Sequence, residues 1–183
     1  MYGMIHQGMQ SLIIENYGDE LWKSIEIDLS IGAAELISAQ VYDDTLTMAI
    51  LSHICNIINM SIDECLYMFG EHWIEFADRG PYSNIMDFTG RTMNEFIGNL
   101  DRLHKTVSMA MPNARMPGFE IVSQSDNELY VVYTSQRKGL EPFVRGLLSG
   151  IAKRFKIDAS VTLKETSQYG SLFVIEYIMD DNQ

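Results

Sequence analysis

Apolar side chains recur at intervals of three and four residues through most of the chain before Met111. In the stretch from Thr92 to Val107, residues Phe96, Leu100 and His104 follow one another at four-residue spacing, so they share one side of a helix. Thr92 with a glutamate three residues later forms a capping-box pattern, which opens a helix. The pattern therefore predicts a helix whose apolar, inward-facing side includes His104.

The same periodicity, together with capping and stop residues, predicts further amphipathic helices. They are Met1 to Tyr17, a short piece around Leu21–Ile25, a helix from Asp43 or Asp44 to about Asn59, one from the Ser61–Glu64 capping box to about Ala77, and one from Pro142 to Phe155. The segment before Gln40 is weakly periodic, so both helix and loop stay open there. Asp78 to Gly90, with two glycines and a proline, is predicted to be a loop.

The pattern changes after Met111, where Pro112, Pro117 and Gly118 interrupt the helical period. Alternating β-branched and aromatic residues then predict two antiparallel hairpins. Their strands are Phe119–Ser123 with Leu129–Ser135, and Ala159–Lys164 with Ser171–Met179. The expected fold class is α+β in a single domain, 1–183. A helical N-terminal lobe (about 1–111) precedes a lobe (about 112–183) with a small antiparallel sheet of about four strands and an inserted helix.

The composition is that of one soluble globular domain. The chain has 183 residues, of which 46% are hydrophobic and 21% charged. A net charge of −12 argues against nucleic acid and anionic membrane as partners. No signal peptide or membrane-length apolar run is present, so a cytoplasmic location is expected. Cys55 and Cys65 are too few for a disulfide framework or zinc site, and we expect buried thiols and no structural metal.

His104 is the first candidate for chemistry. A buried imidazole needs either a hydrogen-bond partner or a ligand to bind. Taken alone, the simpler interpretation is a core histidine bonded to a backbone carbonyl. His53 also lies on an apolar helix face, and no other feature indicates a role for it beyond structure.

A second candidate group is Tyr133, Ser135 and Arg137, spaced two residues apart at the end of a predicted strand. If the strand continues that far, all three side chains leave one face. Two hydroxyls and a guanidinium suit carboxylates, although an exposed face that meets only water is the simpler interpretation. Together with His104, the set suits heme, because an imidazole would hold the iron and the three donors the propionates.

These residues belong to motifs by which the chain resembles the H-NOX family (heme nitric oxide/oxygen binding), which also forms the heme sensor domain of soluble guanylate cyclase. The resemblance covers essentially the whole chain. It rests on Met1-Tyr2-Gly3, Phe69-Gly70-Glu71-His72-Trp73, Asn99 to His104, the tyrosine-x-serine-x-arginine motif from Tyr133 to Arg137, Gly139 to Val144, and Gly150 to Phe155. It implies a stand-alone bacterial member that holds heme b (iron protoporphyrin IX) between its lobes, with His104 as the metal ligand.

The resemblance also assigns roles around the porphyrin. Pro117 matches a family proline that presses on the heme, whereas relatives often have two prolines where this chain has Met116-Pro117. Oxygen-binding members are known for a distal tyrosine at the position of Phe143. Trp73 matches a tryptophan of some nitric oxide-selective relatives, and its indole N–H is expected to be engaged elsewhere. Residues Met4, Ile5 and Leu147 are expected to complete an apolar distal wall.

The expected function is that of a gas sensor and not of an enzyme. Without a distal donor, ferrous heme should bind nitric oxide and carbon monoxide but form no stable oxygen complex. Nitric oxide should weaken and break the bond between iron and His104, so that the lobes rearrange and a partner protein responds. Bacterial relatives imply a histidine kinase or a cyclic-di-GMP enzyme. The alternatives are a non-signalling carrier of heme or of another apolar molecule, and an oxygen-binding family member.

Overall fold

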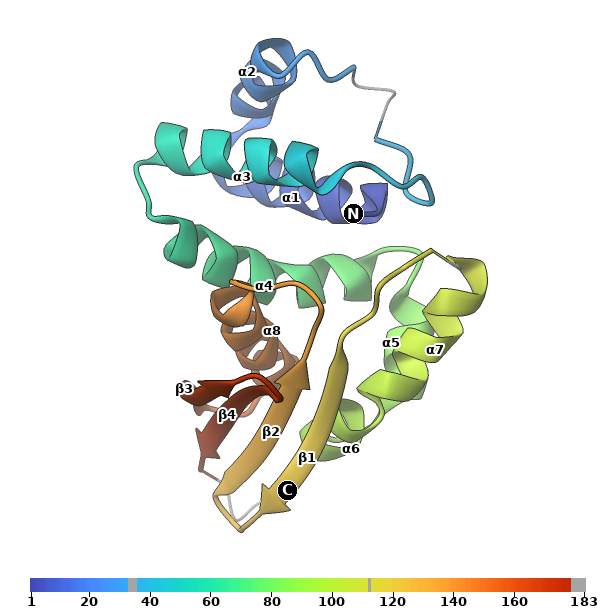
Figure 1. Ribbon diagram of the computed structural model, residues 1–183, viewed down its shortest axis with the longest axis vertical. Helices are drawn as coiled ribbons and strands as arrows, with labels where there is room; N and C mark the ends of the chain where they lie inside the picture. The colour runs from blue at the N-terminus through green and yellow to red at the C-terminus, as the bar shows by residue number, and fades with distance from the viewer. Residues whose placement is uncertain (33–35, 112, 179–183) are drawn as a thin grey trace.

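The computed structural model describes residues 1–32, 36–111 and 113–178 and has the expected α+β architecture (Figure 1). The part of the chain that it describes contains α1 (Gly3–Tyr17), α2 (Asp19–Asp28), α3 (Asp44–Ile58), α4 (Ile62–Arg79), α5 (Ser83–Thr89), α6 (Met93–Gly98), α7 (Leu100–Ala110), β1 (Gly118–Gln124), β2 (Glu128–Thr134), α8 (Glu141–Arg154), β3 (Ala159–Ser167) and β4 (Gly170–Tyr177).

The helix starts follow the capping residues. Ser61 accepts a hydrogen bond from the backbone N–H of Glu64, whose carboxylate accepts one from the backbone of Ser61, so α4 opens with a complete capping box. Asp43, and not Asp44, caps α3. Thr92 caps α6 in the same way through the Glu95 backbone N–H. These local bonds explain why the helix starts could be predicted.

Three predictions about local structure are wrong. The loop expected between Asp78 and Gly90 contains α5, which spans only seven residues and is too short to give a helical period. The helix expected from Thr92 to Val107 is interrupted at Asn99, whose side-chain amide donates to the Thr89 carbonyl at 2.8 Å. The expected strand ends are also inexact: β2 ends at Thr134, one residue early, and β3 continues to Ser167, while the expected end of the last strand, Met179, lies outside the described residues.

The four strands form one antiparallel sheet in the order β1-β2-β4-β3. Tyr133, near the end of β2, pairs with Phe119 on β1 and with Ser171 on β4. In Figure 1, α4 crosses the molecule between the α1–α3 layer and the lower half that contains α8 and the sheet. This arrangement places the end of β2 near the middle of the molecule.

Two hydrophobic clusters build the core. One is formed by α1 to α4 and includes both buried thiols, Cys55 and Cys65, as expected. The other joins α4, α6 and α8 to the sheet. Trp73 and Phe143 are half-buried and pack against both clusters. These two aromatic side chains therefore lie at the boundary between the halves.

Helices α4 and α8 cross at very short distance because both carry glycine at the crossing. A Cβ atom on Gly70 would lie 2.1 Å from the Phe143 carbonyl oxygen, and one on Gly146 would lie 2.0 Å from that of Tyr67. Neither position can take a side chain without moving a backbone. The close crossing fixes Trp73 and Phe143 relative to each other.

Across the described ranges no single helix is long and apolar enough to cross a membrane, and α3 with α4 meets that standard only as a pair bent by 106°.

Candidate functional site

The His104 side chain is held so that one ring nitrogen stays available. Its Nδ1 lies 3.0 Å from the carbonyl oxygen of Pro117, which can only accept, so Nδ1 carries the hydrogen. Burial lowers the pKa of His104, and this effect exceeds the opposing effect of the Pro117 bond. The ring is therefore neutral near pH 7, with the lone pair on Nε2. The backbone bond expected of a core histidine and a free ligating nitrogen are both present.

His104 faces a cavity of about 230 Å³ with mainly apolar walls. All the predicted site residues line it, although they come from both halves of the molecule. They are Met4, Ile5, Trp73, His104, Pro117, Tyr133, Ser135, Arg137, Phe143 and Leu147. The cavity thus combines an imidazole, an apolar wall and a polar edge, the combination that an iron porphyrin with two carboxylates requires.

The sequence missed other parts of this wall. Leu103 and Val107 flank His104 along α7, and a segment from Asn113 to Met116 closes the same side. Val107 belongs to the predicted apolar stripe, which was the available signal. The segment between the lobes has no periodicity, so its position depends on tertiary structure.

The polar edge is assembled by a turn and not by one strand face. Tyr133 is the penultimate residue of β2 and is buried, whereas Ser135 and Arg137 follow the strand. Ser135 Oγ accepts the backbone N–H of Arg137 at 3.0 Å, which folds the chain so that both side chains reach the cavity. Burial raises the pKa of the Tyr133 phenol, so it remains a hydrogen-bond donor at neutral pH. The three predicted donors therefore meet at the cavity, but a turn after β2 brings them there and not a shared strand face.

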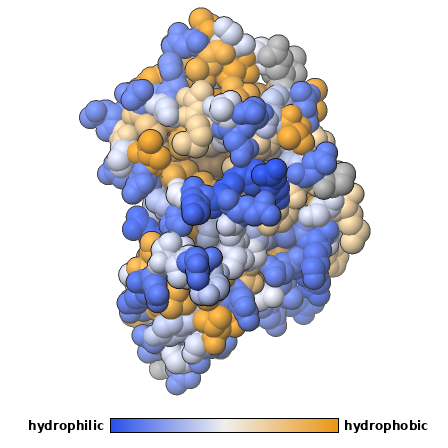
Figure 2. Space-filling model, in the orientation of Figure 1, coloured by the Kyte–Doolittle hydropathy of each residue, from blue (hydrophilic) through white to orange (hydrophobic). Residues whose placement is uncertain are grey.

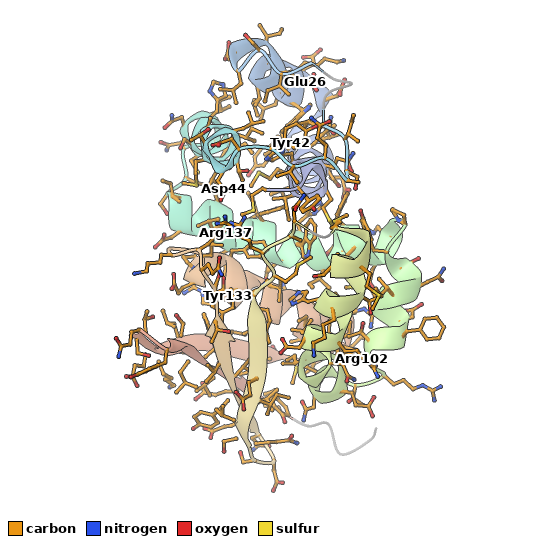
Figure 3. All side chains as sticks on the ribbon, turned by 45° about the vertical axis from the view of Figure 1, so that its right-hand side comes forward. Glu26, Tyr42, Asp44, Arg102, Tyr133 and Arg137 are labelled. Carbon is orange, nitrogen blue, oxygen red and sulfur yellow. The ribbon has the colours of Figure 1, made fainter. Side chains whose placement is uncertain are left out.

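Arg137 already has partners in the protein (Figure 3). Its Nε lies 3.1 Å from Asp44 Oδ2 and its Nη2 lies 3.5 Å from Asp44 Oδ1, while Nη1 donates to the Arg115 carbonyl at 3.2 Å. Hydrogen bonds from the Met1 amino group, and then from Arg137, lower the pKa of Asp44 to about 2. Asp44 was considered only as a helix cap, because no sequence pattern pairs residues so far apart.

The distal wall is apolar except for one indole. Met4 and Ile5 come from α1, Phe143 and Leu147 from α8, and Trp73 from α4. The Trp73 ring packs 6.0 Å from Phe69 and 5.6 Å from Phe76, measured between centroids. No hydrogen bond described in the protein involves its indole N–H, whereas the N–H of Trp22 is held by Glu26 at 2.7 Å. The expectation that the Trp73 N–H is engaged elsewhere is not met.

Two of the three other histidines are buried and bonded away from the cavity, and the third, His53, lies 3.0 Å from Asp28. His6 Nε2 lies 2.8 Å from Thr47 Oγ1, and His72 Nε2 lies 3.0 Å from Ser11 Oγ. Burial is the largest cause of the lowered pKa of each. Neither His6 nor His72 lines the cavity, so His104 is the one histidine in its wall among the described residues.

Comparison with known proteins agrees with this geometry. Residues 2–163 match the family described as Haem-NO-binding. Soluble guanylate cyclase 89Da of Drosophila melanogaster is 24% identical over 155 residues, which are 85% of this chain and 23% of the cyclase. The chain thus spans about a quarter of that relative's length.

Two solved structures share the fold. One is an H-NOX protein from S. oneidensis in the Fe(II) ligation state, a triple mutant, with a TM-score of 0.86, 19% identity and coverage of 100% of this chain and 98% of the other. The second is the oxygen complex of an oxygen-binding H-NOX domain related to soluble guanylate cyclases, with a TM-score of 0.83, 19% identity and coverage of 97% and 95%. With nearly its whole length matched, the chain belongs to the Haem-NO-binding, or H-NOX, family of heme-binding gas-sensor domains.

Proposed function

We propose that this chain binds heme b, with iron on Nε2 of His104 and the propionates at Tyr133, Ser135 and Arg137. The observation that carries the proposal is the Pro117 hydrogen bond, which fixes the His104 tautomer beside a cavity lined by all the expected contacts. In metal sites generally, an acceptor bonded to the other ring nitrogen orients the ligating histidine. Pro117 also lines the cavity, where it can press on one face of a flat guest.

We further propose that the site selects nitric oxide and carbon monoxide over oxygen. Heme bound here would supply a ferrous iron that binds these gases, and nitric oxide would weaken the hold of His104 on that iron. Phe143 offers no hydroxyl at this face, and Met4, Ile5 and Leu147 offer no donor either. A hydrogen-bond donor stabilises bound oxygen more than bound nitric oxide. Because these side chains offer no donor, they disfavour oxygen binding.

The signal proposed for the bound gas is release of His104. This side chain joins α7 to the site, while Met4 and Ile5 of α1 and Arg137 contact the cavity from the other sides. When His104 is released, α7 and the α1 side can take new relative positions, and a separate partner can bind one arrangement preferentially. Bacterial members of the family suggest a histidine kinase or a cyclic-di-GMP enzyme as that partner, in the cytoplasm.

Spectroscopy of the protein produced with heme tests the proposal. The unaltered protein should show a strong Soret band, and His104→Gly should lose it unless imidazole is added. His53→Ala is the control, because His53 lies on α3 outside the cavity wall. A Soret band that persists in His104→Gly without imidazole would assign the iron to another ligand. A colourless unaltered protein would instead favour a carrier of another apolar molecule.

A further inference from the structure

The guanidinium of Arg137 has two forked faces, and the protein occupies one of them. A guanidinium carries five N–H groups, and Asp44 and the Arg115 carbonyl accept three of them. The bonds from Nε and Nη2 to the two Asp44 oxygens use the side-on fork. One N–H group on Nη1 and one on Nη2 remain, and none of the printed bonds uses them. These two N–H groups can donate to a second carboxylate.

Asp44 comes from the other half of the molecule. It is the first residue of α3, whereas Arg137 lies 93 residues later in the turn after β2. Its carboxylate is favoured there by the positive end of the α3 dipole, and the Met1 amino group donates to it at 2.6 Å. Figure 3 shows Asp44 and Arg137 side by side, and Figure 2 shows hydrophilic residues in a band across the middle of the molecule.

The degree of exposure decides what this ion pair can contribute. The side chain of Arg137 is 24% exposed and that of Asp44 is 55% exposed. Exposed ion pairs add little to stability. A two-point contact, however, restricts the long arginine side chain to one orientation, and ordering it in advance removes an entropy cost from ligand binding.

We propose that Asp44 is a positioning residue for heme, holding Arg137 at the cavity wall so that its remaining N–H groups can bind the propionates. The inference rests on the proposed heme site. Asp44 itself does not line the cavity and acts through Arg137. Without it, the guanidinium would sample several rotamers, and the propionates would be held less often.

The test is the rate of heme release from holoprotein to an excess of apomyoglobin. Asp44→Asn should release heme about fivefold faster, the size expected from weakening one charge-assisted hydrogen bond. Asp43→Asn is the matched control. It removes the same charge one residue earlier, makes no contact with Arg137 and keeps a capping side chain on α3. It should release heme at the unaltered rate.

Two further comparisons make the result specific. In an Arg137→Ala background, Asp44→Asn should have no additional effect, because the two residues act in series. With heme dimethyl ester, whose propionates carry no charge, the unaltered protein and Asp44→Asn should release at similar rates. A structural defect would accelerate release in both cases.

A slower release of heme from Asp44→Asn than from the unaltered protein would overturn the inference. Asp44 is an anion near two propionates, so if repulsion dominates, Asp44→Asn will release heme more slowly. Equal rates for Asp44→Asn and the unaltered protein would also overturn it. If the unaltered protein binds heme and His104→Gly loses it, the proposed function stands whichever way Asp44 behaves.

Discussion

At the scale of single residues, the polarity of the distal wall depends on two aromatic side chains. Phe143 and Trp73 both line the cavity, and their rings each pack on Phe69. Phe143→Tyr adds a hydroxyl to this wall, and a hydrogen bond to a charged acceptor contributes about 1.5–3 kcal/mol. We expect this variant to release oxygen at least about tenfold more slowly than the unaltered protein, as measured by stopped-flow spectroscopy of the ferrous form.

Phe76→Tyr is the control, because Phe76 packs on Trp73 but does not line the cavity. It should leave oxygen release unchanged. The Trp73 N–H is the donor that can contradict the prediction of oxygen exclusion. A lasting oxygen spectrum in the unaltered protein that disappears in Trp73→Phe would identify this N–H as the donor, and the selectivity proposal would fail.

The sequence, with the family resemblance, identified ten of the residues that line the cavity, but not how their side chains are held. His104 could be found because a helix period shows which side faces inward, and the propionate set because its motif is local. The hydrogen bond to Pro117 and the ion pair with Asp44 join distant segments, at 13 and 93 residues of separation. No periodicity encodes such pairs, since they depend on how the two halves pack.

At the scale of helices, His6 joins α1 to α3 through a hydrogen bond inside the core. Its side chain is fully buried and its Nε2 lies 2.8 Å from Thr47 Oγ1. Burial, and next the charge of the Met1 amino group, lower the pKa of His6 to about 4, while Asp44 acts in the opposite direction. Between pH 6.5 and about pH 4, His6 is therefore mostly protonated in the unfolded chain and mostly neutral in the folded chain.

This difference makes the protein less stable in acid. Between pH 7 and pH 4.5 the free energy of unfolding should fall by about 2 kcal/mol on account of His6 alone. Urea unfolding of the unaltered protein and of a His6→Leu/Thr47→Val double variant, which leaves no hydroxyl unpaired, isolates this contribution. The double variant should lose about 2 kcal/mol less over that interval, and equal losses in both proteins would contradict the assignment.

The helices that sequence could predict are those with a long period and a local start signal, which is a capping side chain for α3 and α4 and a proline in the first turn for α8. The break at Asn99 was hidden because the four-residue spacing of Phe96, Leu100 and His104 continues across it. A hydrogen bond from the Asn99 side-chain amide to the carbonyl of Thr89, ten residues earlier, accompanies the break. Helix α7 is therefore an independent short helix that carries His104, separated from the better buried α6.

At the scale of the whole molecule, the helices that line the cavity differ in how firmly they are packed. Helices α4 and α8 cross at Gly70 and Gly146 with no space for a Cβ atom, so this crossing joins the two hydrophobic clusters rigidly. By contrast, Leu100 is the one buried side chain among the described residues of α7. A change that begins at the iron should therefore move α7 more easily than α4 or α8.

Hydrogen exchange can show whether the His104 bond is what keeps α7 in place. In the carbon monoxide form of the proposed heme site His104 should stay bound to the iron, so the α7 amides should exchange slowly. In the nitric oxide form the imidazole should be released, and α7 should lose an anchor of about 1–2 kcal/mol, which corresponds to roughly tenfold faster exchange. The α4 amides serve as the internal reference, because their packing against α8 does not involve the iron. Equal α7 protection in the two gas forms, together with an unchanged α4, would mean that the signal leaves the site by another path.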